Sequence, residues 1–162
     1  MAQSPRSAKI WSLQLLDRAE TKLRQRWPFF WISRVNSLYA QTLDKRLKRI
    51  GLDMPRWRVL ISLYEEDYLS VSQIAELGAL RLNTTTKIVQ RLSAEGLVET
   101  RIKPDDARVT EVRMTEKGDE VRALCQVEAD AVLKLGFQNV SEAERQFLNT
   151  ILEKVFQQLE RL

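Results

Sequence analysis

Seven polar side chains between residues 83 and 91 have the composition of a helix surface that recognises base edges. They are Asn83, Thr84, Thr85, Thr86, Lys87, Gln90 and Arg91. Asparagine and glutamine pair twice with adenine, threonine offers a hydroxyl and a methyl group to thymine, and lysine and arginine serve guanine or phosphate. Consecutive β-branched threonines form helices poorly, so helix propensity does not explain the run. A helix start that is simply rich in capping residues is the alternative interpretation.

A second charged group lies between residues 101 and 108, where Arg101, Lys103 and Arg108 flank Asp105 and Asp106. An arginine on a protruding β-loop suits the narrow minor groove, where the negative potential is concentrated. One of the aspartates can hold an arginine in place by a bidentate pair before DNA arrives. The alternative is an ordinary solvated turn, because exposed ion pairs often contribute little.

The segments around the polar run predict a helix-turn-helix. The spacing of Ser70 and Gln73 is that of a capping box, which begins a short helix at about 71–78. Gly78 begins a turn, and a second helix follows at about 83–95, where it would enter the major groove. The apolar residues expected to be buried in these two helices are Ile74, Leu77, Ile88, Val89 and Leu92.

Apolar periodicity predicts helices for the remainder, apart from one β-hairpin. Period-two alternation at 98–102 and 112–114, joined by a polar loop over 103–108, predicts the hairpin. Further helices are expected at 9–26, at 29–49, after Pro55, at 115–136 and at 142–161, with Thr115 and Ser141 as caps. The helix after Pro55 is expected to turn Trp57, Leu60, Leu63 and Tyr64 inward.

The expected fold is therefore mainly α with a small β-hairpin wing. Its organisation would be dimerisation helices at 1–52, a winged helix-turn-helix at 53–114 and further dimerisation helices at 115–162. The segment 29–31 and the apolar face over 148–159 carry more apolar surface than a small winged domain covers. Burial of such area contributes about 25 cal/mol per Å², which favours covering it with a second copy.

Composition excludes several classes of protein. The chain has no histidine and a single cysteine, so it holds no internal disulfide, no histidine-dependent catalytic triad and no conventional zinc site. We therefore expect neither an enzyme nor a cofactor. The net charge of +4 permits nucleic-acid binding without requiring it. No apolar run is long enough for a membrane span and no signal peptide is evident, so a cytoplasmic protein is expected.

Five segments in order resemble the multiple antibiotic resistance regulator (MarR) family. They are Leu69–Glu76, Asn83–Leu92, Glu95–Val98, Asp106–Arg108 and Met114–Gly118. The resemblance spans about residues 29–161 and implies a homodimeric winged helix-turn-helix regulator. Such a regulator would bind a palindromic promoter site, usually repress, and release DNA when a small ligand binds. The wing pair of the family falls on Asp106 and Arg108, but Ala107 stands where a second arginine is common.

The resemblance also implies a ligand pocket between the dimerisation helices and the DNA-binding lobe. Trp27, Trp31, Arg34 and Tyr39 are the candidates to line it, and they would suit an aromatic carboxylate. The alternative is that Trp31 and Tyr39 are core and that Arg34 is a solvated charge. Some relatives sense oxidants, but Cys125 lies among apolar helix residues and is expected to be buried and inert.

After an enzyme, the second competing class is a helical protein-interaction module that uses a winged fold without DNA. It would place acidic or apolar residues at the start of the helix near residue 83, where this chain has Asn-Thr-Thr-Thr-Lys.

Overall fold

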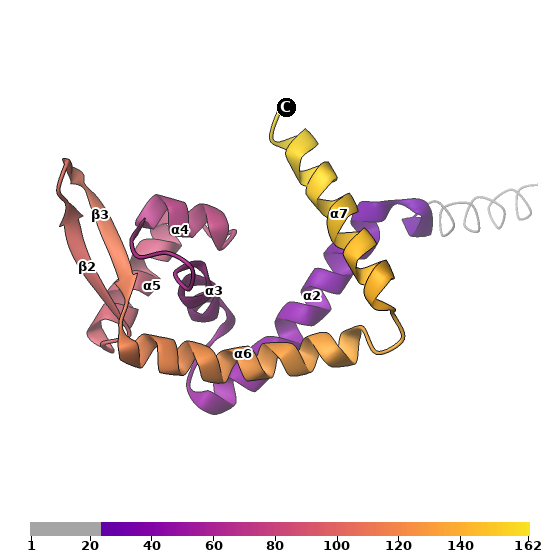
Figure 1. Cartoon of the computed structure of the whole chain (residues 1–162), viewed down its shortest axis with the longest axis horizontal. Helices are drawn as coiled ribbons and strands as arrows, with labels where there is room; N and C mark the ends of the chain where they lie inside the picture. Colours follow the sequence, from indigo (N-terminus) through magenta and orange to yellow (C-terminus); the bar gives the residue numbers. More distant parts are fainter. Residues whose placement is uncertain (1–23) are drawn as a thin grey trace, which may run out of the picture. The chain divides into compact units, whose positions relative to one another are not determined.

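Helices make up most of the structure, and one small antiparallel sheet interrupts their order (Figure 1). The computed structural model describes residues 24–162, so most of the predicted helix over 9–26 lies outside the described residues. The elements are α2 (Pro28–Leu47), η1 (Lys48–Ile50), α3 (Met54–Ser62), β1 (Leu69–Ser70), α4 (Val71–Leu77), α5 (Leu82–Ala94), β2 (Val98–Lys103), β3 (Asp106–Met114), α6 (Glu116–Gly136) and α7 (Glu142–Leu159). This order confirms a mainly α protein with a small β-hairpin wing. The chain divides into a unit that ends at Gln41 and a unit from Thr42 to Leu162.

Side chains cap α4, α6 and α7 at the residues that the sequence indicated. In the predicted capping box of α4, the Gln73 amide donates to Ser70 Oγ at 3.2 Å and the Ser70 amide donates to Gln73 Oε1 at 2.8 Å. Ser141 and Glu144 form the same box at α7, and Thr115 caps α6. Each cap satisfies an amide that the first turn of a helix leaves free.

The wing is a three-stranded antiparallel sheet in the order β1-β3-β2. β2 and β3 form the predicted hairpin, with Val98 opposite Met114. Lys103 pairs with Asp106, so the expected loop over 103–108 is wrong and only two residues form the turn. Asp106, Ala107 and Arg108 begin β3, but their composition alone resembles that of a loop. β1 was not predicted, because two residues are too few for an alternating pattern.

The core of the second unit lies where α3, α4, α5 and the sheet meet (Figure 1). Its fully buried side chains include Leu60, Leu63, Ile74, Leu92 and Val112. Apolar contacts among these elements fix α4 against α5, which is the arrangement of a helix-turn-helix. Over residues 24–162, no helix combines the length and apolarity needed to cross a membrane.

Three residues expected to face the core do not reach it fully. Tyr64 is 51% exposed because it lies past the end of α3, where its ring stacks under the Arg122 guanidinium at 3.8 Å. Leu77 is 63% exposed because it ends the short α4, whose core contacts come from Ile74 and Ala75. Ile88 is only partly buried, at the margin of the buried face of α5.

Candidate nucleic-acid interface

The outer surface of α5 carries the polar run identified in the sequence. α5 begins at Leu82, and no side chain caps its first turn. The free amides and the positive end of the helix dipole at such a terminus favour phosphate groups. The predicted contact residues that are exposed along α5 are Asn83, Thr84, Thr86, Lys87, Gln90 and Arg91. The helix therefore presents hydrogen-bonding and cationic groups together on one surface.

The structure corrects the predicted set of DNA-contact residues at Thr85. It is fully buried, and its hydroxyl donates to the carbonyl oxygen of Arg81 at 3.1 Å. Thr86 is exposed, and its hydroxyl donates to the carbonyl oxygen of Leu82 at 3.0 Å. Thr85 cannot reach a base because it shares the buried face of α5 with Val89 and Leu92. The run of three threonines concealed this difference, because only the helical phase separates them.

Asp106 and Arg108 form the bidentate pair expected at the wing. Arg108 Nε donates to Asp106 Oδ1 at 3.0 Å, and Arg108 Nη2 donates to Asp106 Oδ2 at 3.3 Å. The Arg108 amide also donates to Oδ1 at 3.1 Å, so the aspartate holds both the backbone and the side chain. These hydrogen bonds lower the pKa of Asp106, which stays ionised. The Arg108 side chain is 91% exposed and is oriented before any ligand binds.

Arg101 and Lys103 differ in how firmly they are held. Arg101 Nε donates to Glu111 Oε2 at 2.8 Å, and its guanidinium lies 3.4 Å from the centre of the Tyr68 ring. The Glu111 hydrogen bond raises the pKa of Arg101. Arg101 is thus anchored within the hairpin, whereas the partly buried Lys103 lies beside the turn.

Comparison with known proteins identifies the family. Residues 52–110 match the sequence profile of the MarR family. The chain is also 42% identical over 147 residues to the HTH-type transcriptional repressor IacR of Pseudomonas putida, across 90% of this chain and 88% of the relative. The chain belongs to the MarR family. It is a DNA-binding transcriptional regulator and not an enzyme.

Solved structures share the MarR-family fold of this protein. CouR from Rhodococcus jostii RHA1, bound to p-coumaroyl-CoA, has a TM-score of 0.73 at 22% identity and covers 82% of this chain and 93% of its own. A mutant of MarR from E. coli complexed with operator DNA has a TM-score of 0.68 at 23% identity, with coverages of 77% and 90%. At these identities the likeness concerns the fold.

The four predicted effector residues of this MarR-family chain lie in the first unit, on surface that is exposed in one chain. Trp27 and Trp31 are 60% and 49% exposed, and Trp31 Nε1 donates to the Gln25 carbonyl oxygen at 2.9 Å. Arg34 lies over the Phe30 ring at 5.6 Å, and Tyr39 is 37% exposed. Their exposure argues against the alternative of a core role within one chain, but a role in ligand binding stays a prediction.

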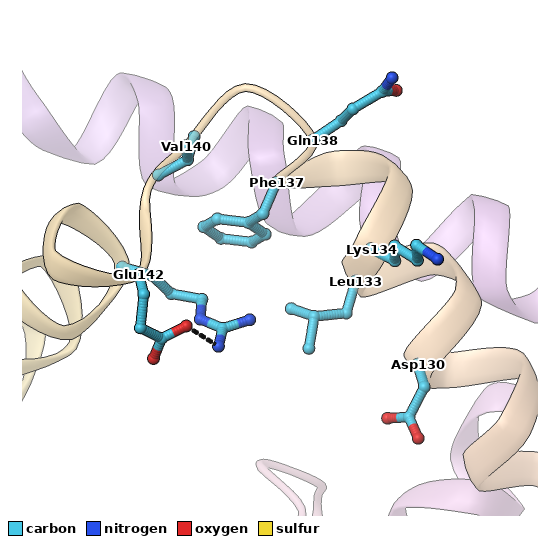
Figure 2. Close-up of a pocket in the computed structure, with 8 residues that line it drawn as sticks. Asp130, Leu133, Lys134, Phe137, Gln138, Val140 and Glu142 are labelled. Carbon is cyan, nitrogen blue, oxygen red and sulfur yellow. Dashed lines mark hydrogen bonds and ion pairs between the residues drawn. The ribbon is translucent and has the colours of Figure 1, made fainter.

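A cavity of about 380 Å³ lies elsewhere, at the turn between α6 and α7 (Figure 2). Phe137 and Leu133 lie along its apolar side, and the Glu142–Arg145 ion pair lies at its edge. None of the four predicted effector residues lines it. Cys125 is fully buried in α6, as expected, and burial raises the pKa of its thiol to about 11.

Two residues near α5 were not singled out from the sequence. Glu95 is the C-terminal cap residue of α5 and accepts a hydrogen bond from Arg91 Nε at 3.0 Å. Arg56 in α3 is buried beside Glu95. In the sequence, the one feature that pointed to an ion pair of Arg56 was its position three residues after Asp53, which caps α3. A charged residue near a helix start is ordinarily read as exposed.

Proposed function

We propose that this MarR-family protein is a cytoplasmic, ligand-responsive repressor that binds a palindromic operator as a homodimer. The observation that carries the proposal is the exposed polar surface of α5 next to a wing whose arginine is already oriented. α5 contacts β2, so the helix and the hairpin belong to one DNA-binding lobe.

In the proposed complex, the first turns of α5 enter the major groove. Asn83, Thr84, Thr86 and Lys87 would face base edges, and Gln90 with Arg91 would follow along the helix. Lys103 and Arg108 of the wing would reach the adjacent minor groove, with Asp106 orienting Arg108 and Arg101 supporting the hairpin. Ala107 offers no second arginine there, so we expect the wing to contribute less than a wing with two arginines would.

The exposed apolar surface of α7 supports the proposed homodimer. α7 has no buried residue, and Leu148, Ile151, Leu152, Val155 and Leu159 recur along one face, each between 36% and 50% exposed. A contiguous apolar face of this kind is costly in water and marks an interface. We propose that 1–52 and 115–162 form the dimer and that 53–114 binds DNA. A twofold axis would place two α5 helices about 34 Å apart, one turn of DNA.

The proposed effector is an aromatic carboxylate, bound near Trp27, Trp31, Arg34 and Tyr39 once the dimer covers them. An exposed arginine among exposed aromatic rings supports this chemistry. The relative named a repressor and the structural neighbour bound to p-coumaroyl-CoA support a repressor that responds to a ligand.

The deciding experiment is the selection of fragments that the protein retains from its own genome, followed by a salt titration of the best fragment. We expect one inverted repeat with half-sites one helical turn apart. The logarithm of affinity should fall linearly with the logarithm of salt concentration, with a steep slope set by the phosphates contacted. Equal retention of random fragments, or a flat salt dependence, would contradict the proposal.

A further inference from the structure

A buried arginine joins three segments at the C-terminal end of the DNA-binding helix. Arg56 is 7% exposed. Its Nε donates to Asp53 Oδ2 at 3.2 Å, and its Nη1 lies 3.1 and 3.0 Å from the two carboxylate oxygens of Glu95. Its Nη2 donates to the Gly51 carbonyl oxygen at 2.7 Å. Every nitrogen of the guanidinium is thus engaged, so the group has one orientation and fixes its partners.

Glu95 is shared between this buried arginine and an exposed one. Its Oε1 also accepts from Arg91 Nε at 3.0 Å, one turn earlier in α5. The Arg91 side chain is 63% exposed and belongs to the polar surface proposed to face DNA. Among residues 24–162, no acceptor is hydrogen-bonded to the two Nη groups of Arg91. These groups can therefore meet phosphate oxygens while Nε stays on Glu95.

The backbone at Glu95 is held independently of its carboxylate. Lys117 Nζ donates to the Glu95 carbonyl oxygen at 2.8 Å, and Thr115 Oγ1 donates to the carbonyl oxygen of Gly96 at 2.8 Å. Replacing the carboxylate by an amide should therefore leave the end of α5 in place. The effect of such a change would come from the side chains alone.

We propose that Glu95 is a positioning residue for a DNA contact made by Arg91, and that Arg56 holds Glu95 for this task. The inference rests on the proposed function. A free arginine loses side-chain freedom when it binds, and an arginine oriented in advance loses less. Because Arg56 already compensates the negative charge of Glu95, the carboxylate orients Arg91 more than it repels phosphate. The competing role, in which Glu95 holds Arg91 away from DNA, predicts the opposite sign.

A double-mutant cycle on the full-length protein tests the proposal. We expect Arg91→Ala to weaken binding to the selected fragment about fivefold to tenfold and to lower the salt slope by about one phosphate contact. Glu95→Gln should weaken binding about threefold to fivefold in the wild-type chain and have no further effect in the Arg91→Ala chain. Arg56→Lys, which keeps the charge but loses the planar fork, should behave like Glu95→Gln.

Glu99→Gln is the matched control, because Glu99 pairs with Arg113 in the hairpin. Its effect should be the same with and without Arg91. Thermal unfolding of each variant separates lost folding from lost binding, and the Glu95–Arg91 cycle remains decisive if Arg56→Lys does not fold. Tighter binding by Glu95→Gln, an equal effect in both backgrounds, or normal binding by Arg91→Ala would overturn the inference. A wild-type chain that binds no specific fragment would instead overturn the proposed function.

Discussion

Thr85 and Thr86 are neighbours in α5, but the first is buried and contributes to stability, whereas the second is exposed on the surface proposed for recognition. Thr85 lies inside the protein with its hydroxyl bonded to the Arg81 carbonyl, whereas Thr86 is exposed on the surface proposed to read DNA. Both hydroxyls bond back to the preceding turn, which leaves the methyl group of Thr86 as its distinctive feature. A thymine methyl group is its natural partner.

Alanine at each of these positions should have a different effect. Thr85→Ala removes a buried methyl group and a hydrogen bond and should lower the free energy of unfolding by about 1–2 kcal/mol, with base preference unchanged. Thr86→Ala should alter preference at one operator position by about 1–3 kcal/mol while stability changes by less than about 0.5 kcal/mol. Denaturant titration and binding-site selection measure the two effects. A changed motif for Thr85→Ala would contradict the assignment.

Arg108→Ala should weaken operator binding roughly tenfold without dissociating the dimer, because the side chain is exposed and already oriented by Asp106. A gel-shift titration together with sedimentation measures both properties. Asp106→Asn, which weakens the orienting pair but leaves the arginine, should have a smaller effect in the same direction. Arg161→Ala removes an exposed arginine beyond the end of α7, outside the apolar face proposed for the dimer, and is the control that should bind normally. Wild-type affinity for Arg108→Ala would show that the wing does not contact DNA.

The buried thiol of Cys125 predicts a loss of stability at alkaline pH. Burial raises its folded pKa from 9.0 to about 11. Below pH 9 both states hold the proton, whereas between about pH 9 and 11 only the folded state does, so rising pH favours unfolding by up to about 1.4 kcal/mol per pH unit. Cys125→Ala should lack this component in urea titrations at pH 8 and pH 10.5. Parallel pH dependence in the two proteins would contradict the buried thiol.

For single residues, the sequence predicted which kind of interaction a side chain makes better than it predicted whether that side chain is buried or which distant residue it contacts. The Asp106–Arg108 pair was predicted because both partners lie close in the chain and their charges are complementary. Thr85 was assigned wrongly because composition does not define helical phase to within one residue. Arg56 and Glu95 were missed because they pair with each other across 39 residues of sequence, and no local pattern indicates such a buried ion pair.

Among the elements, α6 begins in close contact with the residues at the base of the wing. A Cβ atom added to Gly118 would lie 2.0 Å from the Leu97 carbonyl oxygen and 2.9 Å from Met114 Cγ. The same carbonyl oxygen accepts a hydrogen bond from the Thr115 amide, so it cannot easily move. Gly118 therefore permits α6 to begin directly against the recognition lobe.

Gly118→Ala should lower the free energy of unfolding by about 3 kcal/mol, because backbone must shift to admit the methyl group. Gly136, at the end of α6, has nothing within 4 Å of an added Cβ and provides the matched control. Gly136→Ala should be neutral or slightly stabilising. Thermal and denaturant unfolding of the two variants compare them. Equal effects would show that Gly118 does not lie against the Leu97 carbonyl group.

Most elements could be predicted because their boundaries are encoded locally. The capping boxes at Ser70 and Ser141 and the cap at Thr115 begin helices at the expected residues. The hairpin turn was placed too broadly, because polar strand residues resemble loop residues. β1 escaped prediction because it exists only through its pairing with Val112 and Glu111, which are far along the chain.

On the scale of the whole molecule, the excess of apolar residues predicted that one chain leaves an apolar surface exposed. It did not predict which surface covers it. The apolar run over 148–159 indicated an interface, and α7 is indeed exposed along that face. The predicted effector residues also lie exposed within one chain. Both features would be completed by a second copy, whose geometry depends on surfaces that no single-chain periodicity describes.

The proposed dimer makes one substitution in α7 affect DNA binding at a distance. Leu152→Glu places a charge at the centre of the apolar face and should shift the protein to monomers, because burying an unpaired carboxylate in an interface is costly. A monomer engages one half-site, so operator affinity should fall at least tenfold. Gln157→Glu adds the same charge on the opposite face of α7 and should leave both properties unchanged. Sedimentation and gel-shift titrations at matched concentrations measure them. A dimeric Leu152→Glu protein would place the interface elsewhere, whereas a monomer with full affinity would show that one subunit is sufficient for recognition.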